Sequence, residues 1–147
     1  MTDNHAEREH SLYSPSAFDR WSRCPGSVQL TKDMPDEPGD AALRGTWCHE
    51  QVERLLGGEG IDALSEYATP ETIRHIFEVV DHVKELIEHC SLFEAPEVHY
   101  ERRVSFNNDF EDVFGTSDLS IYDRSDSHLY VVDYKFGSGL VPPDSAQ

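Results

Sequence analysis

The fold class predicted by the sequence is α+β, with N-terminal helices packed on a three-stranded antiparallel sheet. Two observations predict it. Helix start signals and apolar residues at a period of about 3.6 occupy the chain up to Pro96. Beyond Pro96, three runs rich in Val, Tyr, Phe and Ile are typical of strands. Helices followed by consecutive strands favour an antiparallel sheet that carries its helices on one face.

The helices are expected over residues 15–23, 40–56 and 70–90. Each begins next to a residue type that favours the N-cap position, namely Ser14, Asp40 and Thr69. Gly57 and Gly58 are expected to close the second helix. The third helix carries an apolar stripe at helical spacing, formed by Ile73, Ile76, Phe77, Val80, Val83, Ile87 and Cys90. The stripe predicts which face of this helix is buried.

The strands are expected over residues 97–106, 113–122 and 129–136. The last two follow each other closely, so they are predicted to form a hairpin around a turn at residues 123–128.

Composition limits the functions open to the chain. Its 147 residues and 16.7 kDa predict one domain at residues 14–147, after a disordered lead at residues 1–13. Twelve basic against 29 acidic side chains give a net charge of −17, which excludes a general electrostatic attraction to nucleic acid. Contact with DNA through bound metal cations and a local basic patch, or imitation of DNA, stays open. A polar N-terminus, the lack of a long apolar run and three cysteines favour a cytoplasmic protein.

The predicted hairpin brings two carboxylates together. If it closes symmetrically, Tyr122 pairs with Leu129 and Asp118 faces Asp133, with Cβ atoms about 4.5–5.5 Å apart. Like charges at that distance require a cation between them. Strand alternation places Lys135 on the same face as Asp133. Oxygen ligands in this arrangement suit Mg²⁺ or Mn²⁺. The alternative is a salt bridge from Lys135 to one aspartate, with the other solvated.

The second predicted helix adds a histidine. His49 and Glu53 lie four residues apart, so they share one helix face. An imidazole close to a carboxylate-bound cation would be a nitrogen ligand and would shift the preference toward Mn²⁺. The alternative is an ordinary surface or core histidine with a glutamate as its helical neighbour.

Four segments, in order along the chain, resemble a known nuclease family. They are Ser14–Ser27, Gly45-Thr46-x-x-His49-x-x-x-Glu53, Gly115-Thr-Ser-Asp118 and Val131-Val-Asp133-Tyr-Lys135. The last three look like motifs I, II and III of RecB-like exonucleases in the PD-(D/E)XK superfamily, and the first resembles the opening helix of that group. The likeness spans residues 14–147 and is closest to uncharacterised phage and prophage nucleases. It implies a restriction-endonuclease-like α/β core.

The resemblance assigns roles to the motif residues. It implies that His49, Asp118 and Asp133 bind a Mg²⁺ or Mn²⁺ ion, with the carbonyl of Tyr134 as a further ligand. Lys135 would orient the attacking water or help to deprotonate it, and would stabilise charge at the phosphate. The chemistry is consistent, because a bound divalent metal lowers the pKa of its water and neutralises phosphoryl oxygens.

Two glutamates and the last residue complete the expected site. Glu53 would hold His49 in place, and Glu101, on the first strand, could reach the site. In the family, motif III is followed by a helix bearing Gln-x-x-x-Tyr and by a further strand. Gln147 is a candidate for the first residue of that motif. The resemblance therefore implies that the final helix and strand of the core are missing here, and that a second copy or a protein partner would complete the sheet.

Other groups of residues are weaker candidates. Arg20, Arg23, Arg102 and Arg103 are candidate phosphate contacts, and their alternative is a role as surface salt-bridge partners. Some members of the family hold an iron–sulfur cluster with four cysteines. The sequence does not match that set, so no cluster is expected.

The sequence thus leaves two functions open. The first is a metal-dependent DNA exonuclease that hydrolyses phosphodiester bonds of linear or single-stranded DNA for a phage or prophage. The second is a catalytically incomplete, acidic binding or inhibitory protein that imitates DNA or binds a nuclease. The motif residues favour the first, and the charge of −17 favours the second.

Overall fold

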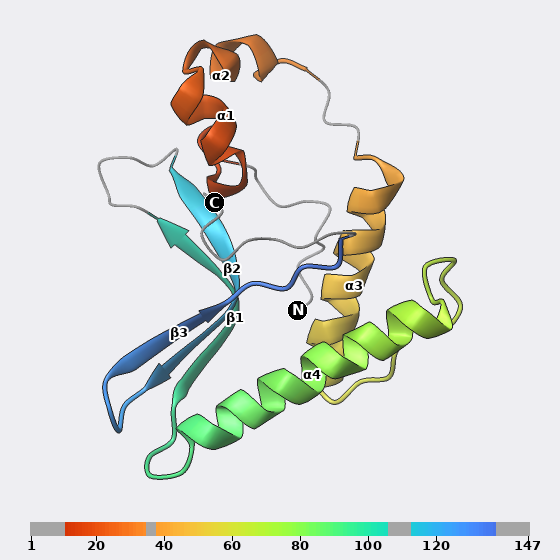
Figure 1. Cartoon of the computed structure of the whole chain (residues 1–147), viewed down its shortest axis with the longest axis vertical. Coiled ribbons are helices and arrows are strands. Elements are labelled where there is room, and N and C mark those ends of the chain that lie inside the picture. The colour runs from red at the N-terminus through yellow and green to blue at the C-terminus, as the bar shows by residue number, and fades with distance from the viewer. Residues whose placement is uncertain (1–10, 35–37, 106–112, 138–147) are drawn as a thin grey trace. The chain divides into compact units, whose positions relative to one another are not determined.

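The α+β class is confirmed by the computed structural model, which describes residues 11–34, 38–105 and 113–137 (Figure 1). Its helices are a short 3-10 helix at Pro15–Ala17, α1 at Phe18–Arg23, α2 at Gly26–Thr31, α3 at Asp40–Leu56 and α4 at Pro70–Cys90. Its strands are β1 at Glu97–Ser105, β2 at Phe114–Asp123 and β3 at His128–Val132. The chain divides into two compact units. Unit 2 consists of Gly39–Arg102 and Ser117–Gly137, and unit 1 contains the remaining residues.

In unit 1, the structure describes residues 11–13, the end of the segment that the sequence predicted to be a disordered lead. The hydroxyl oxygen of Ser11 accepts hydrogen bonds from the backbone N–H groups of Tyr13, at 3.2 Å, and Phe114, at 3.3 Å. Pro15 packs directly on Gly115, where an added Cβ would lie 2.7 Å from the Pro15 Cγ. The glycine of the predicted motif II is thus required by this close approach.

Helix α1 begins after a proline turn, as expected, but Ser14 does not cap it with its side chain. Instead, the Ser14 carbonyl accepts a hydrogen bond from Nε1 of Trp21 at 3.0 Å. After Cys24 the chain enters a further helix, α2, where the sequence predicted none. Arg20 Nη1 donates a 2.8 Å hydrogen bond to Thr31 Oγ1, which joins α2 to α1.

The bounds of α3 and α4 agree with the predicted ones, because local signals set them. Gly57 follows the last residue of α3. The side chain of Thr69 caps α4 by accepting a hydrogen bond from the backbone N–H of Thr72 at 3.2 Å. Asp40 was expected to cap α3, and this is wrong by one position. Gly39 is the N-cap, and Asp40 lies in the first turn, where its charge suits the helix dipole.

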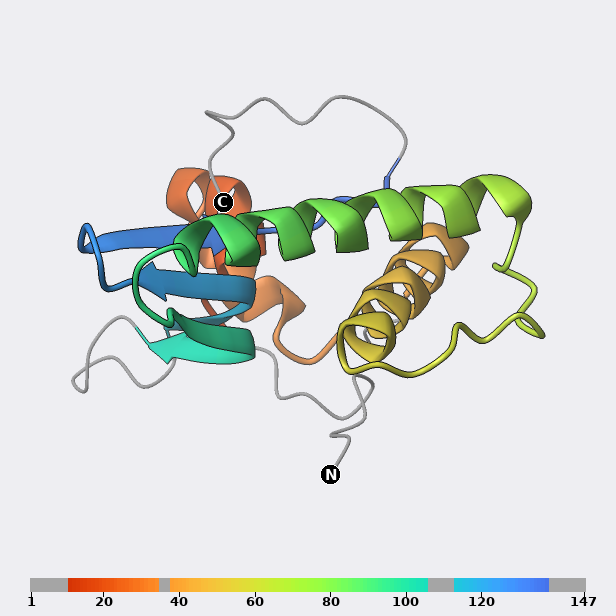
Figure 2. The same cartoon turned by 90° about the horizontal axis from the view of Figure 1, so that it is seen from below.

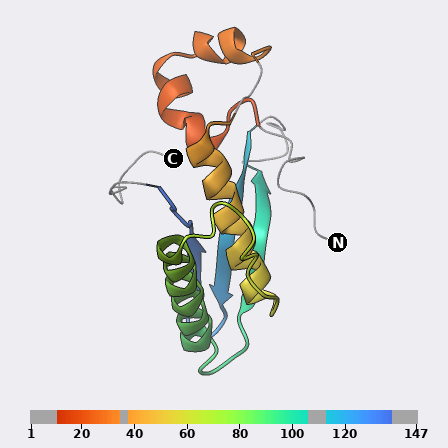
Figure 3. The same ribbon diagram turned by 90° about the vertical axis from the view of Figure 1, so that its right-hand side faces the viewer.

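In unit 2, α3 and α4 lie on one face of the sheet and close the hydrophobic core over it (Figures 2 and 3). The buried residues of this core are Trp47, Cys48, Val52, Ile76, Val80, Val83, Cys90, Leu119, Ile121 and Tyr134. Phe77 was expected in the buried stripe but is 44% exposed. It lies about 100° around the helix from Ile76, which turns it away from the sheet. No helix among the described residues is long and apolar enough to cross a membrane.

The described sheet has the order β1-β2-β3, and β2 pairs with β3 in antiparallel orientation. The predicted register is confirmed, since Tyr122 pairs with Leu129. However, β3 ends at Val132, before the predicted end at residue 136. The ladder therefore stops at the pair Leu119–Val132 and never reaches Asp133.

Candidate metal centre

Three different elements of unit 2 bring ligand atoms to one point. His49 comes from α3, Glu101 from β1 and Asp118 from β2. One ligand atom from each residue lies within 4.8 Å of the others. All three side chains are half-buried, so they are screened from bulk water and still accessible. The group joins residues far apart in the sequence, and each is held by regular secondary structure.

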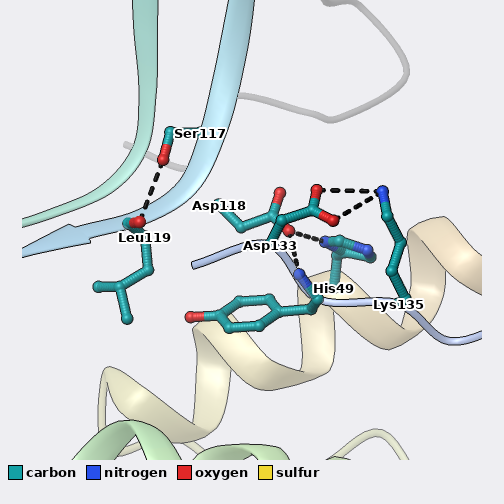
Figure 4. A network of polar contacts seen from close by, with 7 residues as sticks. His49, Ser117, Asp118, Leu119, Asp133 and Lys135 are labelled. Carbon is teal, nitrogen blue, oxygen red and sulfur yellow. Dashed lines mark hydrogen bonds and ion pairs between the residues drawn. The ribbon is translucent and has the colours of Figure 1, made fainter. Parts of the chain in front are cut away.

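The imidazole of His49 is fixed by Asp118 and by aromatic rings. Its Nδ1 lies 3.5 Å from Oδ2 of Asp118, as Figure 4 shows. The rings of Tyr134 and Phe136 have their centroids 5.8 Å and 5.4 Å from that of the imidazole. Burial alone would lower the pKa of His49, but the hydrogen bond to Asp118 and nearby carboxylates, Glu101 among them, outweigh burial, so its pKa lies above the ordinary value. The surroundings of His49 therefore favour a positive charge.

Asp118 is the centre of the hydrogen bonding at this site. Its Oδ2 accepts a 2.6 Å hydrogen bond from the backbone N–H of Tyr134 as well as contacting His49. Burial would raise the pKa of Asp118, but the bonds to His49 and to the Tyr134 N–H outweigh it, with help from the charge of Lys135. The pKa of Asp118 is therefore lower than usual. The carboxylate stays ionised and remains an anionic ligand.

Glu101 has an unusual backbone conformation. Its φ is 47°, in the left-handed region that residues other than glycine rarely adopt. Such a residue interrupts the regular alternation of a strand, and the conformation costs of order 1–3 kcal/mol unless surrounding structure holds it. Backbone strain of this kind is concentrated at functional sites. The sequence indicated that Glu101 could reach the site, and the structure places it there.

Asp133 and Lys135 form a separate ion pair beside this group (Figure 4). The Lys135 Nζ lies 2.8 Å from one carboxylate oxygen of Asp133 and 3.1 Å from the other. Both side chains are about half exposed, at 45% and 50%. The ladder ends at Leu119–Val132, one pair before the expected pair of Asp118 and Asp133, and the Asp118 side chain accepts the Tyr134 N–H. The open alternative agrees in its first part, since Lys135 pairs with Asp133, but the other aspartate, Asp118, is half-buried and hydrogen-bonded instead of solvated.

Other predicted site residues do not belong to the group of His49, Glu101 and Asp118. Glu53 is exposed, and among the described residues no side-chain hydrogen bond or ion pair joins it to His49. The part of Tyr134 that contacts the site is its N–H and its buried ring, whereas its carbonyl was the predicted ligand. Arg102 is exposed on β1. Gln147 lies outside the described residues.

The other three arginines that were predicted as phosphate contacts belong to unit 1 and have local partners. Arg20 donates to Thr31, and Arg23 pairs with Asp19 at 2.8 Å. The guanidinium of Arg103 lies over the ring of Phe114, 3.5 Å from its centroid.

Sequence reasoning missed two features of this site. The aromatic support of His49 by Phe136 was not anticipated, although Phe136 follows the predicted motif III directly. The second is the backbone hydrogen bond from Tyr134 to Asp118. A signal for the first exists, since an aromatic residue beside a strand end is suited to cover a neighbouring helix. No local signal predicts the second, because it depends on where the strand ends.

The donor set of this group fits a divalent cation. Ligand distances of about 2.0–2.2 Å put two donors of one ion at most about 4.4 Å apart. A small inward movement of His49, Glu101 and Asp118 therefore suffices. One imidazole and two carboxylates suit Mn²⁺, and also Mg²⁺ with more water ligands. Asp133, the third predicted ligand, is not part of this group, because both of its carboxylate oxygens face the Lys135 ammonium.

A family model described as a protein of unknown function, DUF2800, matches residues 10–147 of the chain. No solved structure shows a significant match. The family description names no activity, so the function must be argued from the site.

Proposed function

This chain belongs to the DUF2800 family, and we propose that it is a metal-dependent nuclease that hydrolyses phosphodiester bonds in DNA. The observation that carries the proposal is the convergence of His49, Glu101 and Asp118 within 4.8 Å. The Asp133–Lys135 ion pair beside this group supplies the cationic side chain that phosphoryl chemistry needs. The resemblance to RecB-like phage and prophage nucleases supports the same reading, because His49 and Asp118 belong to its first two motifs.

The proposed reaction is hydrolysis with water as the nucleophile. The water oxygen forms a bond to phosphorus, the bond from phosphorus to one sugar oxygen breaks, and that oxygen takes up a proton. A divalent ion held by His49, Glu101 and Asp118 would lower the pKa of a bound water and offset phosphoryl charge. The ammonium of Lys135, held by its ion pair with Asp133, would stabilise charge on the phosphate and orient the water.

The proposal is tested by metal binding and cleavage measured on the same samples. Calorimetric titration with Mn²⁺ and Mg²⁺ should show binding to the wild type and its loss in Asp118→Asn. Linear and single-stranded DNA should be cleaved only with one of these ions, and Lys135→Ala should abolish cleavage without abolishing metal binding. Lys84→Ala, at an exposed position of α4, is the matched control and should behave as wild type. Cleavage that survives both Asp118→Asn and Lys135→Ala would overturn the proposal.

The charge of −17 supports a second candidate, an acidic binding or inhibitory protein. A protein that imitates DNA presents carboxylates where DNA presents phosphates, and it occupies the basic groove of its partner. Such a protein would inhibit a DNA-binding enzyme in proportion to its concentration, in EDTA as well as with metal. Substitution of His49, Asp118 or Lys135 would leave that inhibition unchanged, whereas it would remove nuclease activity.

A further inference from the structure

Gly45 lies inside α3, more than one helical turn from either end of the helix. Glycine weakens a helix interior relative to alanine, because it loses more conformational freedom on folding. The backbone does not require glycine here, since the residue is helical and the only described glycine with a positive φ is Gly58. Packing does not require it either, because no atom of the described residues lies within 4 Å of an added Cβ. Neither conformation nor packing therefore explains this glycine.

The position of Gly45 relative to the metal centre follows from helix geometry. Gly45 precedes His49 by four residues in α3, so the two residues lie on one face of the helix, about 6 Å apart along its axis. Helical side chains lean toward the N-terminus of their helix, so the side chain of His49 extends over the turn that begins at Gly45. A side chain at position 45 would flank the imidazole on its N-terminal side, and glycine leaves that side open.

Other sides of His49 are occupied by the chain. Its Nδ1 lies 3.5 Å from Oδ2 of Asp118 (Figure 4). The rings of Tyr134 and Phe136 lie against the imidazole, with centroids at 5.8 Å and 5.4 Å. A phosphate that reaches this histidine must therefore approach from a side that the hairpin does not cover. Among the described residues, the turn of α3 at Gly45 is such a side.

We propose that Gly45 is a positioning residue, over which the sugar–phosphate backbone of a DNA strand passes to place its phosphodiester at the group of His49, Glu101 and Asp118. The inference rests on the nuclease function proposed above and deepens it, because it names the path of a polymeric substrate to the metal centre. Glycine is the residue that allows a protein backbone and a ligand to approach each other closely. A side chain at position 45 should therefore hinder a DNA strand, but not a small phosphodiester that does not extend over this turn.

The test compares two substrates for the full chain with Mn²⁺, in the wild type, Gly45→Ala and Gly45→Leu. One substrate is a fluorescein-labelled DNA oligonucleotide, and the other is bis(p-nitrophenyl) phosphate, a small phosphodiester. We expect kcat/KM for the oligonucleotide to fall in Gly45→Ala, and by at least about tenfold in Gly45→Leu, because a displacement of about 1 Å can slow a reaction by about 100-fold. For the small phosphodiester, kcat/KM should stay close to the wild-type value, and so should the Mn²⁺ affinity measured by calorimetry.

Gly60→Leu is the matched control. Gly60 is exposed in the connection between α3 and α4, its φ is not positive, and nothing among the described residues lies within 4 Å of an added Cβ. This variant receives the same side chain away from His49 and should cleave both substrates like the wild type.

Urea unfolding in EDTA is recorded for each variant. Gly45→Leu should be at least as stable as the wild type, because leucine favours a helix more than glycine does. A lower stability would mean that the chain itself fills this space, and it would overturn the inference. An equal loss of activity on both substrates would overturn it as well. If the wild type cleaves DNA and Gly45→Leu cleaves it equally well, only the path over Gly45 is refuted. If the wild type does not cleave DNA with Mn²⁺ or Mg²⁺, the nuclease proposal fails and the inference fails with it.

Discussion

The backbone N–H of Tyr134 donates a 2.6 Å hydrogen bond to Oδ2 of Asp118, the same oxygen that lies 3.5 Å from Nδ1 of His49. In a regular hairpin that N–H would donate to a backbone carbonyl of the partner strand. A side-chain oxygen takes the place of the carbonyl, so the last ladder pair is Leu119–Val132. Asp118 therefore contributes both to the local fold of the hairpin and to the metal centre.

These two roles of Asp118 can be separated by two substitutions. Asp118→Asn keeps an oxygen that can accept the Tyr134 N–H but removes the charge, whereas Asp118→Ala removes both. We expect both variants to lose at least about tenfold in Mn²⁺ affinity. Only Asp118→Ala should lower the free energy of unfolding, by about 1–3 kcal/mol, because it leaves the N–H without its acceptor. Calorimetry and urea unfolding in EDTA measure the two effects, and equal stability of the two variants would contradict the structural role.

Two substitutions of Glu101 can likewise separate the backbone strain at this residue from the metal binding by its carboxylate. Glu101→Gln and Glu101→Gly both remove the carboxylate, but only glycine adopts a φ of 47° without steric cost. Both variants should bind Mn²⁺ more weakly than the wild type. In metal-free buffer, the glycine variant should be more stable than the glutamine variant by about 1 kcal/mol. If glutamine were the more stable, the left-handed conformation would not be a source of strain.

His49 is expected to set the preference between metals. Imidazole is a softer ligand than carboxylate, so His49→Ala should weaken Mn²⁺ binding more than Mg²⁺ binding. Because a ligand that binds only the folded state stabilises it, Mn²⁺ should raise the melting temperature of the wild type, and the rise should shrink in His49→Ala. Melting curves at several Mn²⁺ and Mg²⁺ concentrations measure this. An absence of any shift at millimolar Mn²⁺ would count against a formed site.

Local signals explain why much of this fold could be predicted. Gly57 after α3 and the pair Thr69-Pro70 before α4 act within a few residues, so the helix bounds agree with the sequence pattern. The register of the last hairpin could be predicted for a similar reason. Its turn is short, and a hairpin that closes symmetrically around it pairs Tyr122 with Leu129.

The details of the metal centre could not be predicted because they depend on contacts between distant residues. Lys135 and Asp133 were expected on one face of a strand, and they form an ion pair beyond the end of β3. The bond from the Tyr134 N–H to Asp118 lies at this strand end, and no strand pattern encodes it. Glu101 was named as a residue that could reach the site, but its left-handed backbone angle is not encoded by any strand pattern. The aromatic contact of Phe136 with His49 requires the helix and the hairpin to be packed first.

The β2–β3 turn predicts a dependence of stability on pH. Asp123 is buried, and its carboxylate accepts hydrogen bonds from the Ser125 hydroxyl at 2.6 Å and the Ser125 N–H at 2.9 Å. These bonds lower the pKa of Asp123 below its ordinary value. A group whose pKa is lower in the folded state stabilises the fold above its unfolded pKa of about 3.9, and that stabilisation is lost as the pH falls through the folded pKa.

Ser125→Ala should therefore reduce the loss of stability on acidification. It removes the hydroxyl bond to Asp123, so the pKa of Asp123 moves back toward its unfolded value and less proton uptake accompanies unfolding. Urea unfolding at a series of pH values from neutral to about pH 3 gives the slope. Ser120→Ala, in β2, serves as the control and should keep the slope of the wild type. A steeper slope in Ser125→Ala would contradict this account of the turn.

Gly45 and Gly115 stand at the start of two similar motifs, but the structure gives them different surroundings. Each is followed by threonine in the sequence. An added Cβ at Gly115 would lie 2.7 Å from the ring of Pro15, whereas nothing lies within 4 Å of one at Gly45. Gly45 is inside α3, where glycine costs about 0.5–1 kcal/mol relative to alanine.

We therefore expect opposite effects of the two glycine-to-alanine substitutions. Gly115→Ala should destabilise the protein by about 1–3 kcal/mol, because the rigid proline ring cannot move away without shifting the backbone. Gly45→Ala should stabilise it by about 0.5–1 kcal/mol. Urea unfolding of both variants in EDTA checks the sign of each change. DNA cleavage by Gly45→Ala then adds a second result. Because Gly45 lies one helical turn before His49, a more stable variant with slower cleavage would mean that the open space beside this glycine is needed by the substrate.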